Sequence, residues 1–122
     1  MSKTILITGA TSGFGEAMAH VFAAAGNKLI VTGRKESVLA RLKETLVSKH
    51  NVTVHTLCFD VQNKEAVFEA VNSIPAAFKN IDVLINNAGL ALGRDTFQDA
   101  NLDDWETMID TNVKGLLYVS KA

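Results

Sequence analysis

The stretch Thr8–Gly15, Thr-Gly-Ala-Thr-Ser-Gly-Phe-Gly, decides the fold of this chain. It follows the apolar run Thr4–Ile7, which has the length of a short buried strand. It precedes a helical pattern in which apolar residues recur at i, i+3, i+4 and i+7 from Met18 to Ala25. The glycines therefore lie where a strand turns into a helix, and the free N–H groups of a new helix favour an anion at that point.

Each glycine of this turn has its own expected role. Gly9 permits a tight turn, Gly13 lets the backbone approach a pyrophosphate, and Gly15 lets the helix pack closely on the strand. The spacing Gly-x-x-x-Gly-x-Gly differs from the common Gly-x-Gly-x-x-Gly, and glycine clusters are often only turns. The strand before and the helix after are the context that a phosphate-binding loop requires. The candidate dinucleotide contacts in this loop are Gly9, Thr11, Ser12, Gly13, Phe14 and Gly15.

Composition and charge exclude several classes of protein. The chain has 122 residues, of which 48% are hydrophobic and 20% charged, a balance typical of soluble globular domains. The net charge of −1 comes without a basic stripe, so we expect neither a nucleic-acid partner nor an anionic membrane surface. No apolar stretch approaches the roughly 20 residues of a membrane span, and no secretory signal pattern is present.

Cysteine and histidine usage predicts no covalent or metal cross-link. Cys58 is the single cysteine, which excludes an internal disulfide and fits a reducing compartment, so we expect a cytoplasmic protein. Because Cys58 lies in a strand-like run, we expect a buried structural thiol. His20, His50 and His55 show no metal-ligand spacing, and we expect no metal site.

Along the rest of the chain, short apolar runs alternate with helical periodicity. We expect strands at 29–32, 52–59 and 81–85. The first helix should end at Gly26, a second should bury apolar residues between 38 and 46, and a third should run from an Asn63 cap to Pro75. After a loop to about residue 101, Asp103 or Asp104 should cap the last helix.

This alternation predicts an α/β fold with a parallel sheet covered on both faces. Right-handed crossovers favour a partial Rossmann-type, doubly wound sheet of four strands in the order 3-2-1-4, with helices on both faces. Its ligand crevice lies at the carboxyl ends of the strands. Four motifs fall at such ends: residues 9–15, 33–34, 60–61 and 86–89.

Together these motifs resemble the short-chain dehydrogenase/reductase family. The matches are Thr8-Gly9-x-x-x-Gly13-x-Gly15, Asp60-Val61, Asn86-Asn87-Ala88-Gly89 and Asn112-x-x-Gly115. The resemblance implies that Asp60 hydrogen-bonds the adenine ring and that Val61 contacts it. It also implies that Asn87, Ala88 and Gly89 shape the crevice beside the cofactor, and that Asn112 belongs to the catalytic site.

Two stretches, 89–93 and 104–112, are similar to a narrower subgroup, the NADP-dependent 3-hydroxy acid dehydrogenases. That likeness implies hydride transfer between NADP and a small hydroxy acid or carbonyl substrate, of the L-serine or L-allo-threonine type. It also implies a homo-oligomer, a dimer or tetramer, in the full-length protein.

The choice of cofactor follows from the end of the second strand. NAD-binding domains usually place an acid about 20 residues beyond the glycine loop to hold the ribose 2′-OH. Here Thr32-Gly33 is followed by Arg34 and Lys35. A guanidinium offers a fork of donors to a 2′-phosphate, so NADP is favoured. The alternative is that Arg34 is a solvated residue before a helix.

On the last helix, a regular α-helical wheel groups the side chain of Asn112 with apolar neighbours. These neighbours are Trp105, Met108, Ile109 and Leu116. A polar group in an apolar stripe needs partners. The resemblance implies that this asparagine helps to hold a water near the family's active-site lysine. The alternative is an asparagine satisfied locally by the backbone.

The catalytic serine and Tyr-x-x-x-Lys pair of the family have no match here. The single tyrosine, Tyr118, forms Tyr-x-x-Lys with Lys121, and a regular helix turns it about 240° away from Asn112. We therefore interpret residues 1–122 as the dinucleotide-binding portion of a single-domain enzyme whose carboxyl-terminal half is absent. A non-catalytic dinucleotide-binding module or sensor is the alternative. An S-adenosylmethionine domain would not explain residues 86–89 together with Asn112.

Overall fold

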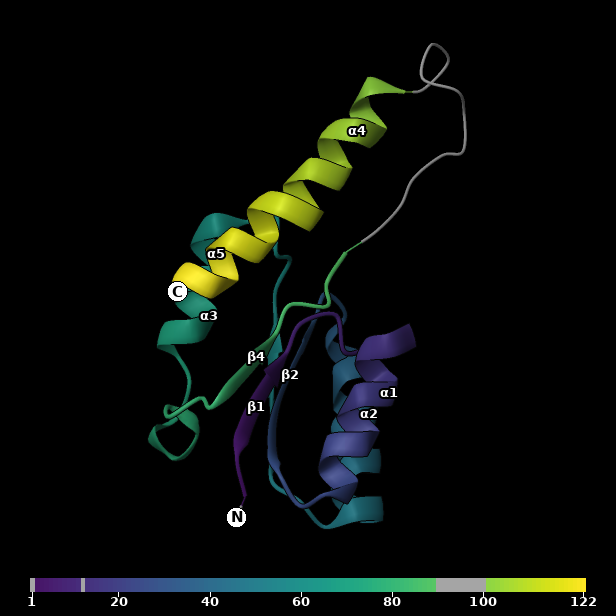
Figure 1. The fold of residues 1–122 in the computed structure, drawn as a ribbon, viewed down its shortest axis with the longest axis vertical. Helices are drawn as coiled ribbons and strands as arrows, with labels where there is room; N and C mark the ends of the chain where they lie inside the picture. Colours follow the sequence, from purple (N-terminus) through teal and green to yellow (C-terminus); the bar gives the residue numbers. More distant parts are fainter. Residues whose placement is uncertain (1, 12, 90–100) are drawn as a thin grey trace.

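The computed structural model describes residues 2–11, 13–89 and 101–122. Within them the strands form a four-stranded parallel sheet in the order β3-β2-β1-β4, which confirms the predicted topology (Figure 1). The strands are β1 (Thr4–Ile7), β2 (Lys28–Gly33), β3 (Val54–Cys58) and β4 (Val83–Ile85).

Helices cover both faces of the sheet. The helices α1 and α2 lie on one face, and α3 and α5 lie on the other (Figure 1). The helix α4, the π-helix η2 and α5 follow one another as a single rod. The bounds are α1 (Gly13–Ala24), α2 (Glu36–His50), α3 (Lys64–Asn72), the 3-10 helix η1 (Ala76–Phe78), α4 (Leu102–Ile109), η2 (Asp110–Gly115) and α5 (Leu116–Lys121).

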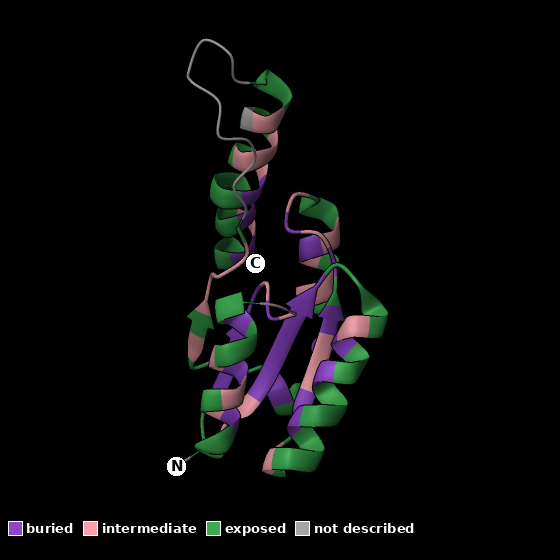
Figure 2. Cartoon of the chain, turned by 90° about the vertical axis from the view of Figure 1, so that its right-hand side faces the viewer, coloured by how far each residue is buried: buried purple, intermediate pink, exposed green. Residues whose placement is uncertain are grey.

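The core is divided between these two faces because side chains alternate along a strand. In β1, Ile5 and Ile7 pack under α1 and α2, whereas Leu6 joins the cluster under α3 and α5. Figure 2 shows buried strands between helices whose outer sides are exposed. Each fully buried aliphatic side chain contributes about 1.5–3 kcal/mol, so both clusters hold the sheet edges in place.

The structure confirms the expected glycine after α1 and the expected cap at the start of α3, and it corrects the residue that caps α4. Gly26 adopts φ +85° just beyond α1, and Asn63 caps α3. The helix α4 is not capped by Asp103 or Asp104. Its cap is Asn101, whose Oδ1 accepts a hydrogen bond from the Asp103 N–H at 2.8 Å. The two acids lie in the first turn instead, where the helix dipole favours negative charge.

The expectation that Cys58 is a buried thiol is wrong. Its side chain is exposed, and Sγ lies 3.5 Å from the carbonyl oxygen of Arg34. Cys58 is the last residue of β3, and this strand begins at a buried Val54 and ends at an exposed Cys58, so the apolar run overstated its burial. The described residues bring together no group of three or more side chains that suits a metal ion. None of the described helices combines the length and the apolar character that spanning a membrane requires.

The Asn63 cap gives a first prediction. Its Oδ1 accepts a hydrogen bond from the Ala66 N–H at 3.1 Å. We expect Asn63→Ala to lower the free energy of unfolding by about 1 kcal/mol, because this helix N–H loses its partner. Asn72→Ala, at the exposed end of the same helix, is the matched control and should be neutral or slightly stabilising. Urea titration measures both variants, and equal losses would show that the cap is unimportant.

Candidate functional site

A cavity of about 410 Å³ lies at the carboxyl ends of the strands. This is the position expected for the ligand crevice of a doubly wound sheet. Ten predicted site residues line it: Gly9, Thr11, Gly13, Phe14, Arg34, Asp60, Val61, Asn87, Ala88 and Gly89. Five residues that the sequence analysis did not assign to the site also line it: Thr32, Gly33, Phe59, Gln62 and Thr111.

Gly13 and Gly15 have different physical roles in the glycine loop. Gly13 begins α1 with φ +59°, and a Cβ on it would meet no protein atom within 4 Å. The space beside it is therefore open toward the helix N-terminus, where backbone N–H groups favour an anion. Gly15 lies behind the loop and does not line the cavity. A Cβ there would collide with the carbonyl oxygen of Gly9 and lie 2.6 Å from Asn87 Nδ2, so Gly15 is required by packing.

Two hydrogen bonds fix the end of β4 against this loop. Asn87 Nδ2 donates to the carbonyl oxygen of Gly9 at 3.0 Å. The Ala88 N–H donates to Thr8 Oγ1 at 2.9 Å, and Thr8 is 1% exposed. The predicted turn at residues 86–89 therefore braces the glycine loop, and Thr8 contributes from beneath the cavity rather than from its wall.

Arg34 and Lys35 occupy different positions after β2. Arg34 is exposed and lines the cavity next to Gly33, whereas Lys35 is the N-cap residue of α2 and is not among the lining residues. Within the described ranges, no carboxylate forms an ion pair with the Arg34 side chain. Its guanidinium is thus available at the cavity rim to an anionic group of a ligand.

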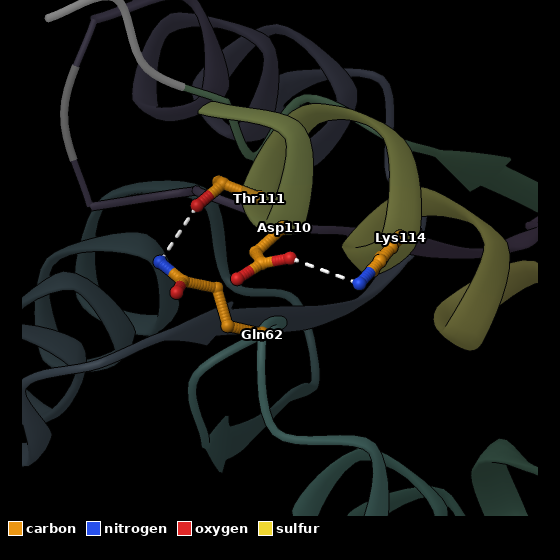
Figure 3. Close-up of polar contacts among 4 residues, drawn as sticks. All are labelled: Gln62, Asp110, Thr111 and Lys114. Carbon is orange, nitrogen blue, oxygen red and sulfur yellow. Dashed lines mark hydrogen bonds and ion pairs between the residues drawn. The ribbon is translucent and has the colours of Figure 1, made fainter. Parts of the chain in front are cut away.

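On the opposite wall, the loop after β3 meets η2. Asp60 Oδ1 accepts a hydrogen bond from the Gln62 N–H at 2.9 Å, and Gln62 Nε2 donates to Thr111 Oγ1 at 2.7 Å (Figure 3). In the sequence, Gln62 and Thr111 belong to no motif themselves, and only the motif residues next to them pointed to this part of the site. Gln62 follows the Asp60-Val61 motif, and Thr111 precedes Asn112.

The environment expected for Asn112 is wrong. Ile109 and Leu116 are 51% and 40% exposed, and Asn112 is exposed too. Residues 110–115 form the π-helix η2, so the last helix is not the regular α-helix that the wheel assumed. Among the described side chains of the rod, the buried positions are Thr111, Gly115 and Val119.

Asn112 nevertheless lies close to the turn after β4. Its Oδ1 is 2.9 Å from where a Cβ on Gly89 would stand. The angle calculated for Tyr118 also assumed a regular helix, whereas part of the segment between Asn112 and Tyr118 belongs to the π-helix η2. Tyr118 packs against the cluster under α3 and α5 and does not line the cavity. Ser12, residues 90–93 of the narrower likeness and the side chain of Trp105 lie outside the described residues.

A family model described as short chain dehydrogenase matches residues 3–122. The chain belongs to this family. It is 52% identical over 122 residues to sulfoacetaldehyde reductase 2 of Chromohalobacter salexigens, covering 100% of this chain and 48% of that protein. It is 49% identical over 118 residues to the NADP-dependent 3-hydroxy acid dehydrogenase YdfG of Salmonella typhi, covering 97% and 46%.

Solved structures of short chain dehydrogenases superpose closely. The serine dehydrogenase of Escherichia coli has a TM-score of 0.88 and 47% identity, and the match covers 98% of this chain and 53% of that one. A closed form of serine dehydrogenase complexed with NADP+ has a TM-score of 0.87 and 47% identity, covering 97% and 46%. The chain thus spans about half the length of the short chain dehydrogenases that it matches.

Proposed function

We propose that this chain is the cofactor-binding portion of an NADP-dependent oxidoreductase. In this proposal, hydride passes between NADP and the CH–OH group of a small hydroxy acid. The observation that carries the choice of NADP is the guanidinium of Arg34 on the cavity rim, which forms no ion pair with a described carboxylate. It lies beside Gly33, and the sequence has no acid at the end of β2. An acid there would repel a 2′-phosphate, whereas a guanidinium attracts it.

The residues that line the cavity suit the successive parts of such a dinucleotide. The open space at Gly13 and the N-terminus of α1 would hold the pyrophosphate, and Arg34 would hold the 2′-phosphate. Asp60 and Val61 would contact adenine, and the turn at 87–89 would lie beside the nicotinamide end. Asp60 uses Oδ1 for Gln62, which leaves its other oxygen for an adenine amino group. When bound, the cofactor supplies the hydride acceptor or donor.

Support for the substrate class comes from the relatives, and it is less specific than the support for the cofactor, which comes from residues of the cavity. The names of the relatives specify a 3-hydroxy acid, serine and sulfoacetaldehyde. All three are small molecules with an anionic group near a hydroxyl or carbonyl. We propose a substrate with this shared chemistry for the full-length protein. Parallel assays with L-serine and with sulfoacetaldehyde distinguish a hydroxyl substrate from a carbonyl substrate. A homo-oligomer is also proposed, with the exposed Leu102, Val113 and Leu117 of the α4–α5 rod as support.

The Arg34 contact gives the second prediction. We expect NADP+ to bind more tightly than NAD+, and Arg34→Ala to lower NADP+ affinity about ten- to a hundredfold, because a charge-assisted contact contributes about 1.5–3 kcal/mol. NAD+ affinity should change little. Arg41→Ala, an exposed position on α2 outside this cavity, is the matched control. Calorimetric titration decides, and equal affinities for the two dinucleotides would refute the assignment.

A further inference from the structure

The wall of the cavity opposite the glycine loop is formed by two segments far apart in the sequence. One is the turn 60–62 after β3, and the other is η2. They touch closely, because a Cβ on Gly115 would lie 2.6 Å from Val61 Cγ2. The absence of a side chain at Gly115 thus brings the rod down onto this turn.

A hydrogen bond also joins η2 to the turn 60–62, and it is directional, unlike the apolar packing. Gln62 Nε2 donates to Thr111 Oγ1 at 2.7 Å, and Thr111 is 6% exposed (Figure 3). The turn that presents Gln62 is itself fixed, since Asp60 Oδ1 accepts from the Gln62 N–H and the Asp60 carbonyl accepts from the Asn63 N–H. Loss of the amide would leave the Thr111 hydroxyl in a buried place without this donor, which is costly.

A nearby ion pair on η2 does not substitute for this hydrogen bond. Lys114 Nζ lies 3.3 Å from Asp110 Oδ1, but both residues belong to η2 and their side chains are 55% and 41% exposed. An exposed i,i+4 pair contributes little and does not join η2 to the sheet. The hydrogen bond between Gln62 and Thr111 therefore adds a directional contact between η2 and the turn 60–62 to the packing of Gly115 on Val61.

The position of η2 matters because of what it carries. Thr111 lines the cavity, and the next residue, Asn112, reaches the Gly89 turn. A π-helix replaces the usual i→i+4 bonds and often marks a functional site in a helix. A side chain that fixes Thr111 thereby also fixes the backbone from which Asn112 projects.

We propose that Gln62 is a positioning residue that couples occupancy of the cavity to the placement of η2. A dinucleotide seated beside Asp60 steadies the turn 60–62, and Gln62 transmits this order through Thr111 to the segment that carries Asn112. This inference rests on the proposed NADP site. Gln62 itself needs no contact with the reacting atoms.

Hydrogen–deuterium exchange of the whole chain tests the proposal, with peptides covering 110–115 and the glycine loop 9–15. Each protein is measured alone and with NADP+ at ten times its own dissociation constant, so that differences in affinity do not enter. In the unmodified chain NADP+ should slow exchange in both segments. In Gln62→Leu the glycine loop should keep its protection, whereas η2 should lose about three- to tenfold of it. Thr111→Val should behave alike, and Thr111→Ser, which keeps the hydroxyl, should restore protection.

The remaining outcomes decide as clearly. Full protection of η2 in Gln62→Leu, or no effect of NADP+ on η2 in the unmodified chain, overturns the inference. If Gln62→Leu fails to fold, the comparison of Thr111→Val with Thr111→Ser takes its place. If the unmodified chain binds no NADP+, the proposed function fails. In that case, hydrogen–deuterium exchange of the unliganded proteins decides the role of the Gln62–Thr111 contact. Faster exchange of η2 in Thr111→Val than in Thr111→Ser and the unmodified chain supports positioning. Equal exchange of η2 in all three proteins overturns it.

Discussion

Gly13→Val is expected to abolish measurable NADP+ binding while the chain still unfolds cooperatively. The loss should be at least about a hundredfold in affinity, or about 2.7 kcal/mol. Gly13 faces open space at the start of α1, and the proposed pyrophosphate would fill that space. A valine side chain would occupy it and push the phosphates away from the helix N–H groups, each of which would make a charge-assisted bond of about 1.5–3 kcal/mol.

A matched control separates this steric effect from backbone strain. Gly13 has φ +59°, so valine is strained there regardless of any ligand. Gly26 has φ +85° and likewise no protein atom within 4 Å of its Cβ position, but it lies beyond the other end of α1. Gly26→Val should therefore lose a similar 1–3 kcal/mol or so of stability and keep its affinity for NADP+.

Calorimetry and urea titration of both variants decide between the two effects. If Gly13→Val binds NADP+ with unchanged affinity, the glycine loop is not the phosphate site. If both variants lose binding in proportion to their stability, the loss comes from strain alone. The pattern we expect, equal strain with unequal binding, assigns the open space at Gly13 to the ligand.

The second large effect concerns catalysis by the 122 residues. We expect no turnover of L-serine with NADP+, because oxidation of a hydroxyl needs a base that takes its proton. Such a base typically accelerates the step about 10²–10⁴-fold. The only tyrosine, Tyr118, lies on α5 and packs against the cluster between the sheet and α3 and α5, not at the cavity. An asparagine such as Asn112 is no base.

The assay follows NADPH absorbance with the chain, its Tyr118→Phe variant and, as positive control, a full-length serine dehydrogenase. Turnover by the chain that disappears in Tyr118→Phe would mean that Tyr118 is the base and would overturn this interpretation. NADP+ binding without turnover is the expected result. A full-length protein that binds NADP+ but acts on neither serine nor sulfoacetaldehyde would favour the non-catalytic module.

Local patterns in the sequence were sufficient for the architecture. Short apolar runs alternate with helical periodicity, and right-handed crossovers then leave the order β3-β2-β1-β4. The same logic places every strand-end motif at one edge of the sheet. The sequence also indicates glycines with special backbone requirements, such as Gly13 and Gly26, because the positive φ that they permit is a property of the residue itself.

Tertiary structure decided what depends on packing across the chain. Gln62 and Thr111 are 49 residues apart, and no periodicity relates them. The π-helix at Asp110–Gly115 lies where the rod packs on Val61, and Asn112, Ile109 and Leu116 are exposed rather than packed in an apolar stripe. Cys58 is exposed at the last position of β3, although it belongs to an apolar run. Sequence periodicity fixes which way a residue faces along its own element, whereas its partners depend on how separate elements meet, and this geometry exists only in the folded chain.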